Sequence, residues 1–337
     1  MAQIVLAMAT THGPQLHTTV EQWQLRVKAD RERKHPFRDG TYSFDELVAM
    51  RRAENLDAMS SLEAQRGYHA RCHAAMTTLA DKWEDVGADV AVILGNDQNE
   101  IYETDELNPA FMVFCGDKIP NYPQSAEAKK SLPPGIAEAE HGHATERYTE
   151  YRGVPQLGAH IINTMIERDF DVAASKKWPK HARNGASHAF GHIYRQVMRD
   201  NVVPNVPIYQ NTFFPPNQPK ASRSYAFGRI VKEAIESWDS DKTVAVFASG
   251  GMSHFVIDES FDRRFVAALR DKDKTYLTTL PLAQLQSGTS ELKSWISLAG
   301  VLESTNADMH EVDYVPCYRS SAGTGTANGF YWWDLRN

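Results

Sequence analysis

Five short apolar runs recur along the chain, separated by longer amphipathic stretches. The apolar runs lie at 3–9, 89–95, 110–116, 206–213 and 243–249. Most of them are continuously apolar rather than alternating, which is typical of strands covered on both faces. Apolar residues recur at helical spacing in the stretches 44–87, 157–170, 224–238 and 290–303. This alternation of strands and helices predicts an α/β fold with a mostly parallel central sheet covered by helices.

The chain shows no internal repeat and no shift in composition that would mark a domain boundary. We therefore expect residues 1–337 to form a single large domain with one helical insertion near residues 20–85. The insertion contains a long amphipathic stretch, which predicts that it covers the mouth of an active site or forms a homodimer face. Stretches rich in proline or glycine at 117–135 and 214–220 are typical of long loops.

The overall composition excludes several classes of protein. The net charge of −7 gives no reason to expect nucleic acid or an anionic membrane surface as a partner. Cys72, Cys115 and Cys317 show no paired spacing, which argues against a disulfide framework or a thiolate zinc site. The apolar run at the N-terminus is too short for a signal peptide or a membrane span, so we expect a cytoplasmic protein.

Polar side chains follow several of the predicted strands at the points where those strands end. His12 follows the first predicted strand, and Gln98 and Glu100 follow the second. His254 comes soon after the strand at 243–249, behind two glycines that allow a close backbone approach. In parallel sheets, ligands bind outside the carboxyl ends of the strands. These side chains are therefore candidates for one shared site.

Two further features contain residue types that bind metals or transfer protons. His188 and His192 are four residues apart, and on a helix both imidazoles would share one face, a spacing that metals use. Glu291 falls in the first turn of a predicted helix with Ser290 as its N-cap, and it could supply a carboxylate beside His12. A structural role also explains each of these residues taken alone, as a core histidine or as a carboxylate that complements a helix dipole.

Two other histidine pairs have simpler explanations. His69 and His73 lie on a long amphipathic stretch and fit the solvated face of a helix. His141 and His143 lie in an acidic segment that is typical of a surface loop. We therefore place neither pair in the candidate site.

Seven segments, taken together and in order, resemble class III extradiol ring-cleavage dioxygenases. This superfamily includes the catalytic subunit of protocatechuate 4,5-dioxygenase, gallate dioxygenase and 3-O-methylgallate dioxygenase, and the resemblance is closest to the single-chain methylgallate type. The segments are ATTHGPQL, VILGNDQNE, ASHAFGHIYRQ, NTFFPPNQP, SGGMSHFVIDE, SGTSELKSWISLAG and VDYVPCYRSSAGTGT. Each motif is weak by itself, but together they run in register over most of the chain.

The resemblance implies a non-haem Fe(II) held by two histidines and a glutamate. By motif position, His12 corresponds to one histidine ligand and Glu291 to the carboxylate. His254 falls on the family's acid/base histidine, and His188 falls on a second active-site histidine that contacts substrate or oxygen. The implied reaction is the cleavage of a catecholic or gallate-like aromatic ring with insertion of both atoms of O2.

The second histidine ligand departs from the family pattern. The family has an Asn-Asp-His tripeptide after the second strand, and Gln98 stands in place of its histidine here. Gln98 could bind iron through its carbonyl oxygen. Alternatively, His188 or His192 could complete the site, or the site could bind iron poorly.

The resemblance also bears on partners and leaves alternatives open. Tyr318 and His192 are candidates for contacts to the substrate, and Arg319 could pair with a substrate carboxylate or form a structural ion pair. We expect a small aromatic substrate, O2 and a homo-oligomer, with a dimer favoured. Three alternatives remain: ring opening of a hydroxypyridone, hydrolysis at a zinc site, and a metal-poor binding protein without enzymatic activity.

Overall fold

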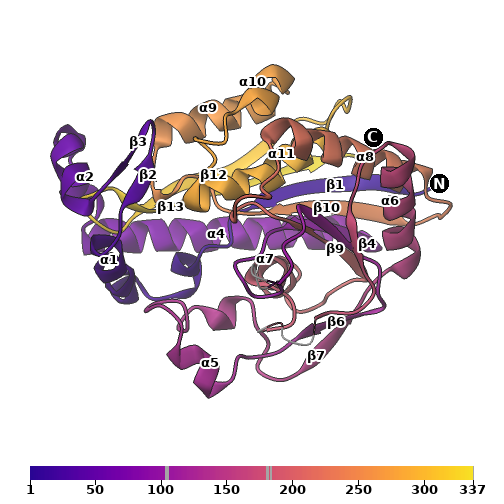
Figure 1. Ribbon diagram of the computed structural model, residues 1–337, viewed down its shortest axis with the longest axis horizontal. Coiled ribbons are helices and arrows are strands. Elements are labelled where there is room, and N and C mark those ends of the chain that lie inside the picture. The colour runs from indigo at the N-terminus through magenta and orange to yellow at the C-terminus, as the bar shows by residue number, and fades with distance from the viewer. Residues whose placement is uncertain (103–105, 180–181, 183, 337) are drawn as a thin grey trace.

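The predicted strands assemble into one central sheet (Figure 1). The computed structural model describes residues 1–102, 106–179, 182 and 184–336. Within these residues the sheet has nine strands, in the order β11-β13-β1-β10-β4-β9-β5-β8, and β12 also pairs with β13. Its strands are β1 (Gln3–Thr10), β4 (Val90–Gly95), β5 (Phe111–Phe114), β8 (Ala173–Ser175), β9 (Asn205–Gln210), β10 (Thr243–Ser249), β11 (His254–Val256), β12 (His310–Tyr318) and β13 (Thr324–Asp334).

The middle of the sheet is parallel. β1 pairs with β10, β10 with β4, and β4 with β9, each in the parallel sense. These four strands are buried along nearly their whole length, because helices cover both of their faces. β13 joins β1 in the antiparallel sense on one side, and β5 joins β9 in the antiparallel sense on the other. The predicted α/β fold is therefore confirmed, with the parallel strands at the centre of the sheet.

Helices pack on both faces of the sheet (Figure 1). One apolar core contains Val92 and Val246 and is covered by α6 (Pro155–Glu167), α8 (Ala221–Ser237), α9 (Glu259–Arg270) and α11 (Leu292–Val301). The opposite core contains Ile93 and Phe247 and is covered by α4 (Leu62–Val86) and α7 (His188–His192). Neighbouring residues of a strand point to opposite faces, so each strand contributes to both cores.

The helices differ widely in length. They are α1 (Trp23–Arg31), α2 (Phe44–Met50), α3 (Leu56–Met59), α4 (Leu62–Val86), α5 (Ala126–Lys130), α6 (Pro155–Glu167), α7 (His188–His192), α8 (Ala221–Ser237), α9 (Glu259–Arg270), α10 (Lys274–Thr279) and α11 (Leu292–Val301). A membrane span needs a longer and more apolar helix than any that the structure describes.

The helical segment near residues 20–85 is present, and the stretch 44–87, predicted from its helical spacing, is divided into the three helices α2, α3 and α4. Asn55 adopts a left-handed conformation with φ of 53° and separates α2 from α3. Ser61 then caps α4, and Gly87 ends it in a left-handed conformation with φ of 60°. Only α4 is long, and it packs beneath β12 and β13.

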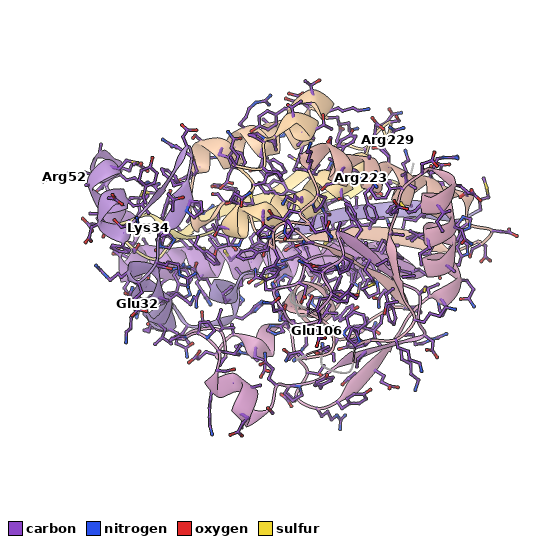
Figure 2. The ribbon with its side chains drawn as sticks, in the orientation of Figure 1. Glu32, Lys34, Arg52, Glu106, Arg223 and Arg229 are labelled. Carbon is purple, nitrogen blue, oxygen red and sulfur yellow. The ribbon has the colours of Figure 1, made fainter. Side chains whose placement is uncertain are left out.

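The outer surface of this helical segment is charged. Figure 2 shows Glu32, Lys34 and Arg52 at the periphery of the segment, and all three side chains are exposed.

Two short strands, β2 (His35–Phe37) and β3 (Gly40–Tyr42), form a hairpin between α1 and α2.

The stretch 117–135, predicted as a long loop, is partly regular. It contains β6 (Lys118–Asn121) and α5, and β6 pairs with β7 (Thr149–Arg152) in a separate two-stranded sheet. The loop prediction for this stretch is therefore wrong. It relied on proline content, but a short two-stranded ribbon accepts Pro120 where a central strand would not.

Helices α8 and α11 pack closely because glycines lie at their contact. A Cβ atom on Gly228 would overlap the carbonyl oxygen of Ser297, and one on Gly300 would overlap that of Tyr225. We expect Gly228→Ala to lower the free energy of unfolding by about 1–3 kcal/mol, because the two helices must move apart. Chemical denaturation measures this change.

The matched control is Gly67→Ala. Gly67 lies within α4, and a Cβ atom added to it would meet no neighbouring atom within 4 Å, so alanine enters open space there. Alanine is expected to raise the free energy of unfolding by roughly 0.5–1 kcal/mol through its higher helix propensity. Equal effects of the two substitutions would contradict the close packing at Gly228.

Candidate metal centre

The carboxyl ends of β1, β4 and β10 lie side by side in the sheet, and polar residues gather beyond them. His12 follows β1, Gln98 follows β4, and His254 begins β11 shortly after β10. His188 at the start of α7 and Glu291 just before α11 are directed to the same place. The structure thus brings these five predicted site residues together.

His12 connects the sheet to the site. Its Nδ1 lies 2.8 Å from the hydroxyl of Ser249, the last residue of β10. Its Nε2 lies 3.2 Å from Oε2 of Glu291 and 3.1 Å from Nε2 of His188. Burial lowers the pKa of His12 and outweighs the opposing effect of Glu291. A neutral imidazole is therefore available, and this is the form that binds metals.

Glu291 is oriented by groups from two strand ends. The backbone N–H of Gly251 donates to its Oε2 at 2.6 Å. The amides of Asn96 and Gln98 donate to its Oε1 at 3.1 and 3.0 Å. Burial by itself would raise the pKa of Glu291, but the neighbouring imidazoles, His12 first, lower it below its usual range. The site therefore holds an ionised carboxylate.

The local structure around Glu291 differs from the sequence prediction. Residues Ser287–Glu291 form a 3-10 turn, and Glu291 itself takes the N-cap position of α11. The hydroxyl of Ser290 has no hydrogen-bond partner among the described residues. The predicted cap by Ser290 is wrong, because the preceding 3-10 turn already supplies partners to the first N–H groups of the helix.

His188 is held by Glu100 at two points. Its backbone N–H donates to Oε1 of Glu100 at 3.0 Å, and its Nδ1 lies 2.5 Å from Oε2. A histidine that donates Nδ1–H to a carboxylate presents Nε2 as a lone pair, as metal-binding histidines do. Burial by itself would lower the pKa of His188, whereas Glu100 raises it. Glu100 therefore increases the basicity of the ring.

The donor atoms of His12, His188 and Glu291 form a small triangle. Each residue offers one atom, and the three atoms lie within 4.8 Å of one another. Donors bound to one cation at about 2.1 Å and at near right angles lie about 3 Å apart. The separations of 3.1 and 3.2 Å at His12 Nε2 match this value. Two imidazoles and one carboxylate are also the donor set of non-haem Fe(II) sites, so the residues fit such an ion.

Gln98 lies beside this triangle. Its amide nitrogen donates to Glu291, on the oxygen that does not face His12. Among the described residues, His12, His188 and Glu291 form the only cluster of three histidines, cysteines or acidic side chains that could hold a metal. The geometry therefore favours His188, one of the alternatives left open by the sequence, as the second histidine.

His254 borders the triangle and turns one ring nitrogen toward it. Its Nδ1 lies 2.7 Å from the carbonyl oxygen of Met252, so Nδ1–H donates there. Its Nε2 lies 3.7 Å from Oε2 of Glu291. A Cβ atom on Gly251 or on Gly288 would overlap the imidazole, so two glycines leave room for the ring. The ring is thus fixed beside the carboxylate with Nε2 turned toward the site.

Three more histidines lie near the cluster; His17 and His192 are buried, and His143 is half-buried. His192 is one turn beyond His188, and its Nδ1 lies 3.1 Å from Nε2 of His17. The ring centroids of His192 and His12 are 6.4 Å apart, and those of His143 and His188 are 6.2 Å apart. Burial lowers the pKa of His17, His143 and His192, that of His143 to about 4. These rings are therefore neutral hydrogen-bonding groups near pH 7.

Two features of the site were not predicted: the role of Glu100 beside His188 and the place of His143. The position of Glu100 after a strand indicates the edge of the sheet, but nothing in the sequence pairs it with His188. The 141–143 segment, which the sequence analysis left outside the site, lies directly against α7, and the ring of His143 is 6.2 Å from that of His188. A Cβ atom on Gly191 would overlap the carbonyl group of His143. The approach of this loop to α7 requires a glycine at position 191, in a distant part of the sequence.

Tyr318 and Arg319 lie at the end of β12, outside the triangle. The hydroxyl of Tyr318 donates to Glu259 at 3.1 Å. Arg319 is buried and donates to both carboxylate oxygens of Asp30, at 2.7 and 2.9 Å. It also donates to the side-chain oxygen of Gln15 at 3.0 Å. The guanidinium of Arg319 therefore already has a carboxylate partner within the chain.

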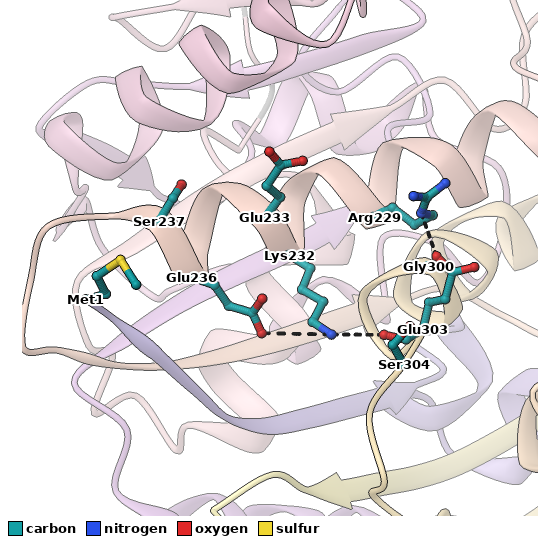
Figure 3. A pocket seen from close by; sticks show the side chains of 9 residues that line it. All are labelled: Met1, Arg229, Lys232, Glu233, Glu236, Ser237, Gly300, Glu303 and Ser304. Atoms are coloured by element: carbon teal, nitrogen blue, oxygen red, sulfur yellow. Dashed lines mark hydrogen bonds and ion pairs between the residues drawn. The ribbon is translucent and has the colours of Figure 1, made fainter.

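A cavity of about 400 Å³ lies elsewhere on the molecule (Figure 3). It is lined by Met1 and by charged residues of α8, among them Arg229 and Lys232. Met1 precedes β1, whereas His12 follows it, so the cavity and the triangle lie at opposite ends of this strand. The cavity is not part of the candidate metal centre.

Comparisons with known proteins identify the family of this chain. A family model described as the catalytic LigB subunit of aromatic ring-opening dioxygenase matches residues 58–330. A gallate dioxygenase of Pseudomonas putida is 31% identical over 109 residues, which are 29% of this chain and 32% of that protein. The match thus spans about a third of the length of this curated relative. A crystal structure of the uncharacterized protein JW3007 from Escherichia coli K12 matches 97% of this chain and 99% of its own, with 10% identity and a TM-score of 0.45.

Proposed function

The chain belongs to the family of the catalytic LigB subunit of aromatic ring-opening dioxygenase, and from this premise we propose a non-haem Fe(II) enzyme acting on a catecholic or gallate-like ring. As a family member, the chain is an extradiol ring-cleavage dioxygenase. The triangle of His12, His188 and Glu291 is the single observation that most supports iron, because it combines two imidazoles with one carboxylate.

We assign His12, His188 and Glu291 as the iron ligands. Three protein ligands leave coordination positions for the two ring oxygens and for O2. When bound, Fe(II) would supply the electron density through which the ring and O2 react. In this assignment His188 replaces the histidine that the family pattern has at position 98, and Gln98 instead orients the carboxylate of Glu291.

We assign His254 as the general acid and base. Its Nδ1–H is engaged by Met252, so a proton from a substrate hydroxyl would be received at Nε2. The same nitrogen would return this proton to oxygen when the O–O bond breaks. An imidazole suits both steps, because one ring nitrogen can accept a proton and later return it.

We expect Glu100→Gln to weaken the affinity for Fe(II) about 10–100-fold, the usual effect of removing a partner of a metal ligand. The side-chain amide of glutamine carries no negative charge, so it cannot stabilise the Nδ1–H tautomer of His188 as the carboxylate of Glu100 does. Anaerobic titration of the purified protein with Fe(II) against a coloured chelator measures this affinity. Glu127→Gln is the control, because Glu127 is an exposed carboxylate on α5. Equal affinities of the two variants would contradict the role of Glu100.

Isotope labelling tests the proposed reaction. Iron-loaded protein is incubated with a ring diol under 18O2, and the product is analysed by mass spectrometry. We expect two 18O atoms in the opened ring. Oxygen that comes only from water, with activity supported by zinc, would indicate a hydrolase. Ring opening confined to hydroxypyridones would change the substrate class and keep the iron site.

We further propose that residues 1–337 form one catalytic domain that assembles as a homodimer through the helical segment near 20–85. Leu25, Met50 and Leu62 belong to this segment, and each exposes more than a third of its surface, which supports a contact there. Light scattering of the purified protein measures the assembly. A monomer at micromolar concentration would contradict the dimer.

A further inference from the structure

Two histidines of α4 bring their ring nitrogens together outside the candidate metal centre. His69 and His73 are four residues apart on this helix, so their side chains share one face. The Nε2 atoms of the two rings lie 3.1 Å apart, and the ring centroids lie 4.3 Å apart. His69 is half-buried beside Trp23, whereas His73 is exposed. An ion in solution can therefore reach these two residues, which we call the α4 histidine pair.

Backbone groups of the segment after His12 set the tautomer of both rings. The backbone of Thr18 forms a hydrogen bond with the imidazole of His69, and that of Leu16 forms one with the imidazole of His73. Both bonds act to raise the pKa of the histidine, as a carbonyl oxygen does when it accepts from a ring N–H. Since Nε2 of each ring faces the other ring, Nδ1 is the nitrogen that donates to the carbonyl. Each ring then presents a lone pair at Nε2.

The charge state of the pair leaves this contact without a proton. Burial is the largest influence on the pKa of both histidines, and it lowers each pKa below the usual value. Two neutral rings of this tautomer direct their lone pairs at each other across 3.1 Å. A shared cation would turn this repulsion into two bonds. Donation of Nδ1–H to a backbone carbonyl is also the usual support of a histidine that binds metal through Nε2.

The distance between the two Nε2 atoms suits a single metal ion. Bonds from zinc to histidine nitrogen are about 2.0–2.1 Å long. Two such nitrogens lie about 2.9 Å apart at a right angle and about 3.4 Å apart at the tetrahedral angle. The observed 3.1 Å falls between these values. Histidines four residues apart on a helix are a spacing that zinc enzymes use.

We propose that His69 and His73 bind one divalent transition-metal ion of the zinc type, at a second site separate from the candidate metal centre. Imidazole nitrogen suits zinc, copper and nickel. Within the described residues the pair is not part of a cluster of three metal-binding side chains, so water completes the coordination. Glu21 adds a negative charge that acts on His69. With two protein ligands instead of three, this site is the weaker of the two.

The bound ion would connect α4 to the turn that follows His12. Leu16 belongs to the 3-10 turn Pro14–His17, and Thr18 comes directly after it. The carbonyls of Leu16 and Thr18 hold the two rings in the tautomer that binds the ion, so metal binding and the order of this turn support each other. The ion therefore has a structural role, and we expect it to raise the unfolding temperature without taking part in the reaction.

Calorimetric titration of the metal-free protein with Zn²⁺ tests this site, and equilibrium dialysis counts the bound zinc. We expect the wild type to bind one ion more than His69→Ala or His73→Ala. In either variant this ion should bind at least about 100-fold more weakly, because a lost ligand costs more than the 10–100-fold effect of a lost ligand partner. Zn²⁺ should also raise the Tm of the wild type more than that of either variant. Alanine is a good helix former, so α4 is retained.

His310→Ala is the control, because His310 is an exposed histidine of β12 whose ring stacks on Trp332. It should bind as much zinc as the wild type. Equal zinc content of the wild type and both variants of the pair would overturn the proposal. Zinc that is lost equally in His310→Ala, or that does not level off at one additional ion, would show adventitious binding and overturn it too. The test counts only the ion that the pair holds, so its outcome is independent of iron binding and of ring cleavage.

Discussion

His188→Ala is expected to lower the affinity for Fe(II) by at least about 100-fold, because a lost ligand costs more than the 10–100-fold effect of a lost ligand partner. His188 Nε2 lies 3.1 Å from Nε2 of His12, within the triangle that also contains Glu291. Without the imidazole, one histidine and one carboxylate remain as ligands. Two protein ligands bind a divalent metal ion only weakly. Anaerobic titration with Fe(II) followed by measurement of bound iron gives the affinity.

Gln98→Ala is the matched comparison for His188→Ala. Gln98 donates to Glu291 and is one of three groups that orient this carboxylate, so we expect a loss of about 10-fold, at the lower end of the effect of a ligand partner and below the effect of a ligand. The opposite order, with iron retained by His188→Ala and lost by Gln98→Ala, would contradict the assignment. It would indicate instead that Gln98 binds iron through its carbonyl oxygen. Circular dichroism of both variants checks that the fold is unchanged.

His254→Ala is expected to keep the iron and to lose about 10²–10⁴ in kcat, the usual contribution of general acid and base catalysis. His254 lies outside the triangle of donor atoms, and its Nε2 is 3.7 Å from Glu291. Loss of proton transfer by His254 is therefore expected to lower the turnover rate more than the iron content. The measurement is the rate of O2 uptake by iron-loaded protein at saturating substrate.

Two further measurements test the role of His254. Added imidazole should restore part of the rate in His254→Ala, because the two glycines beside the ring leave space that the variant does not fill. His73→Ala, at an exposed histidine of α4, should behave as the wild type. Turnover of His254→Ala near the wild-type rate would remove the acid/base assignment, and loss of its iron would make His254 a ligand.

The sheet and its carboxyl edge could be predicted from the sequence because both depend on local patterns. Continuous apolar runs define β1, β4 and β10, and the parallel arrangement of such strands places their ends at one edge. This is why His12, Gln98 and His254 can be selected from the sequence alone. The apolar pattern that predicts these strands can be recognised without knowing which residues bind the metal.

The ligand set could not be predicted in the same way, because it depends on contacts between distant parts of the chain. His188 and His12 are separated by 176 positions, and His188 and Glu100 by 88. A helical spacing of His188 and His192 indicates a shared face, but it does not say what that face meets. The hydrogen bond between Glu100 and His188 is the contact on which we base the proposal that His188 is a metal ligand rather than an ordinary core histidine.

The partners of charged side chains could not be predicted from the sequence either. Arg319 is a candidate for binding a substrate carboxylate by its motif, yet its carboxylate partner Asp30 lies 289 positions earlier, on α1. Helix α1 belongs to the helical segment near 20–85. The sequence of this segment indicates an amphipathic helix, but it does not show where the side chains of Asp30 and Arg26 point. Both residues are buried, and the contact of Asp30 with Arg319 ties α1 to the end of β12.

The measurement that tests the central claim most directly is O2 uptake by protein loaded anaerobically with Fe(II). The substrates are gallate, 3-O-methylgallate, 3,4-dihydroxybenzoate and 3-hydroxy-4-pyridone, and the zinc-loaded protein is the control. We predict iron-dependent uptake of one O2 for each ring opened, with a catecholic or gallate-like ring as the best substrate. No uptake with any of these rings, although iron is bound, would contradict the proposed function.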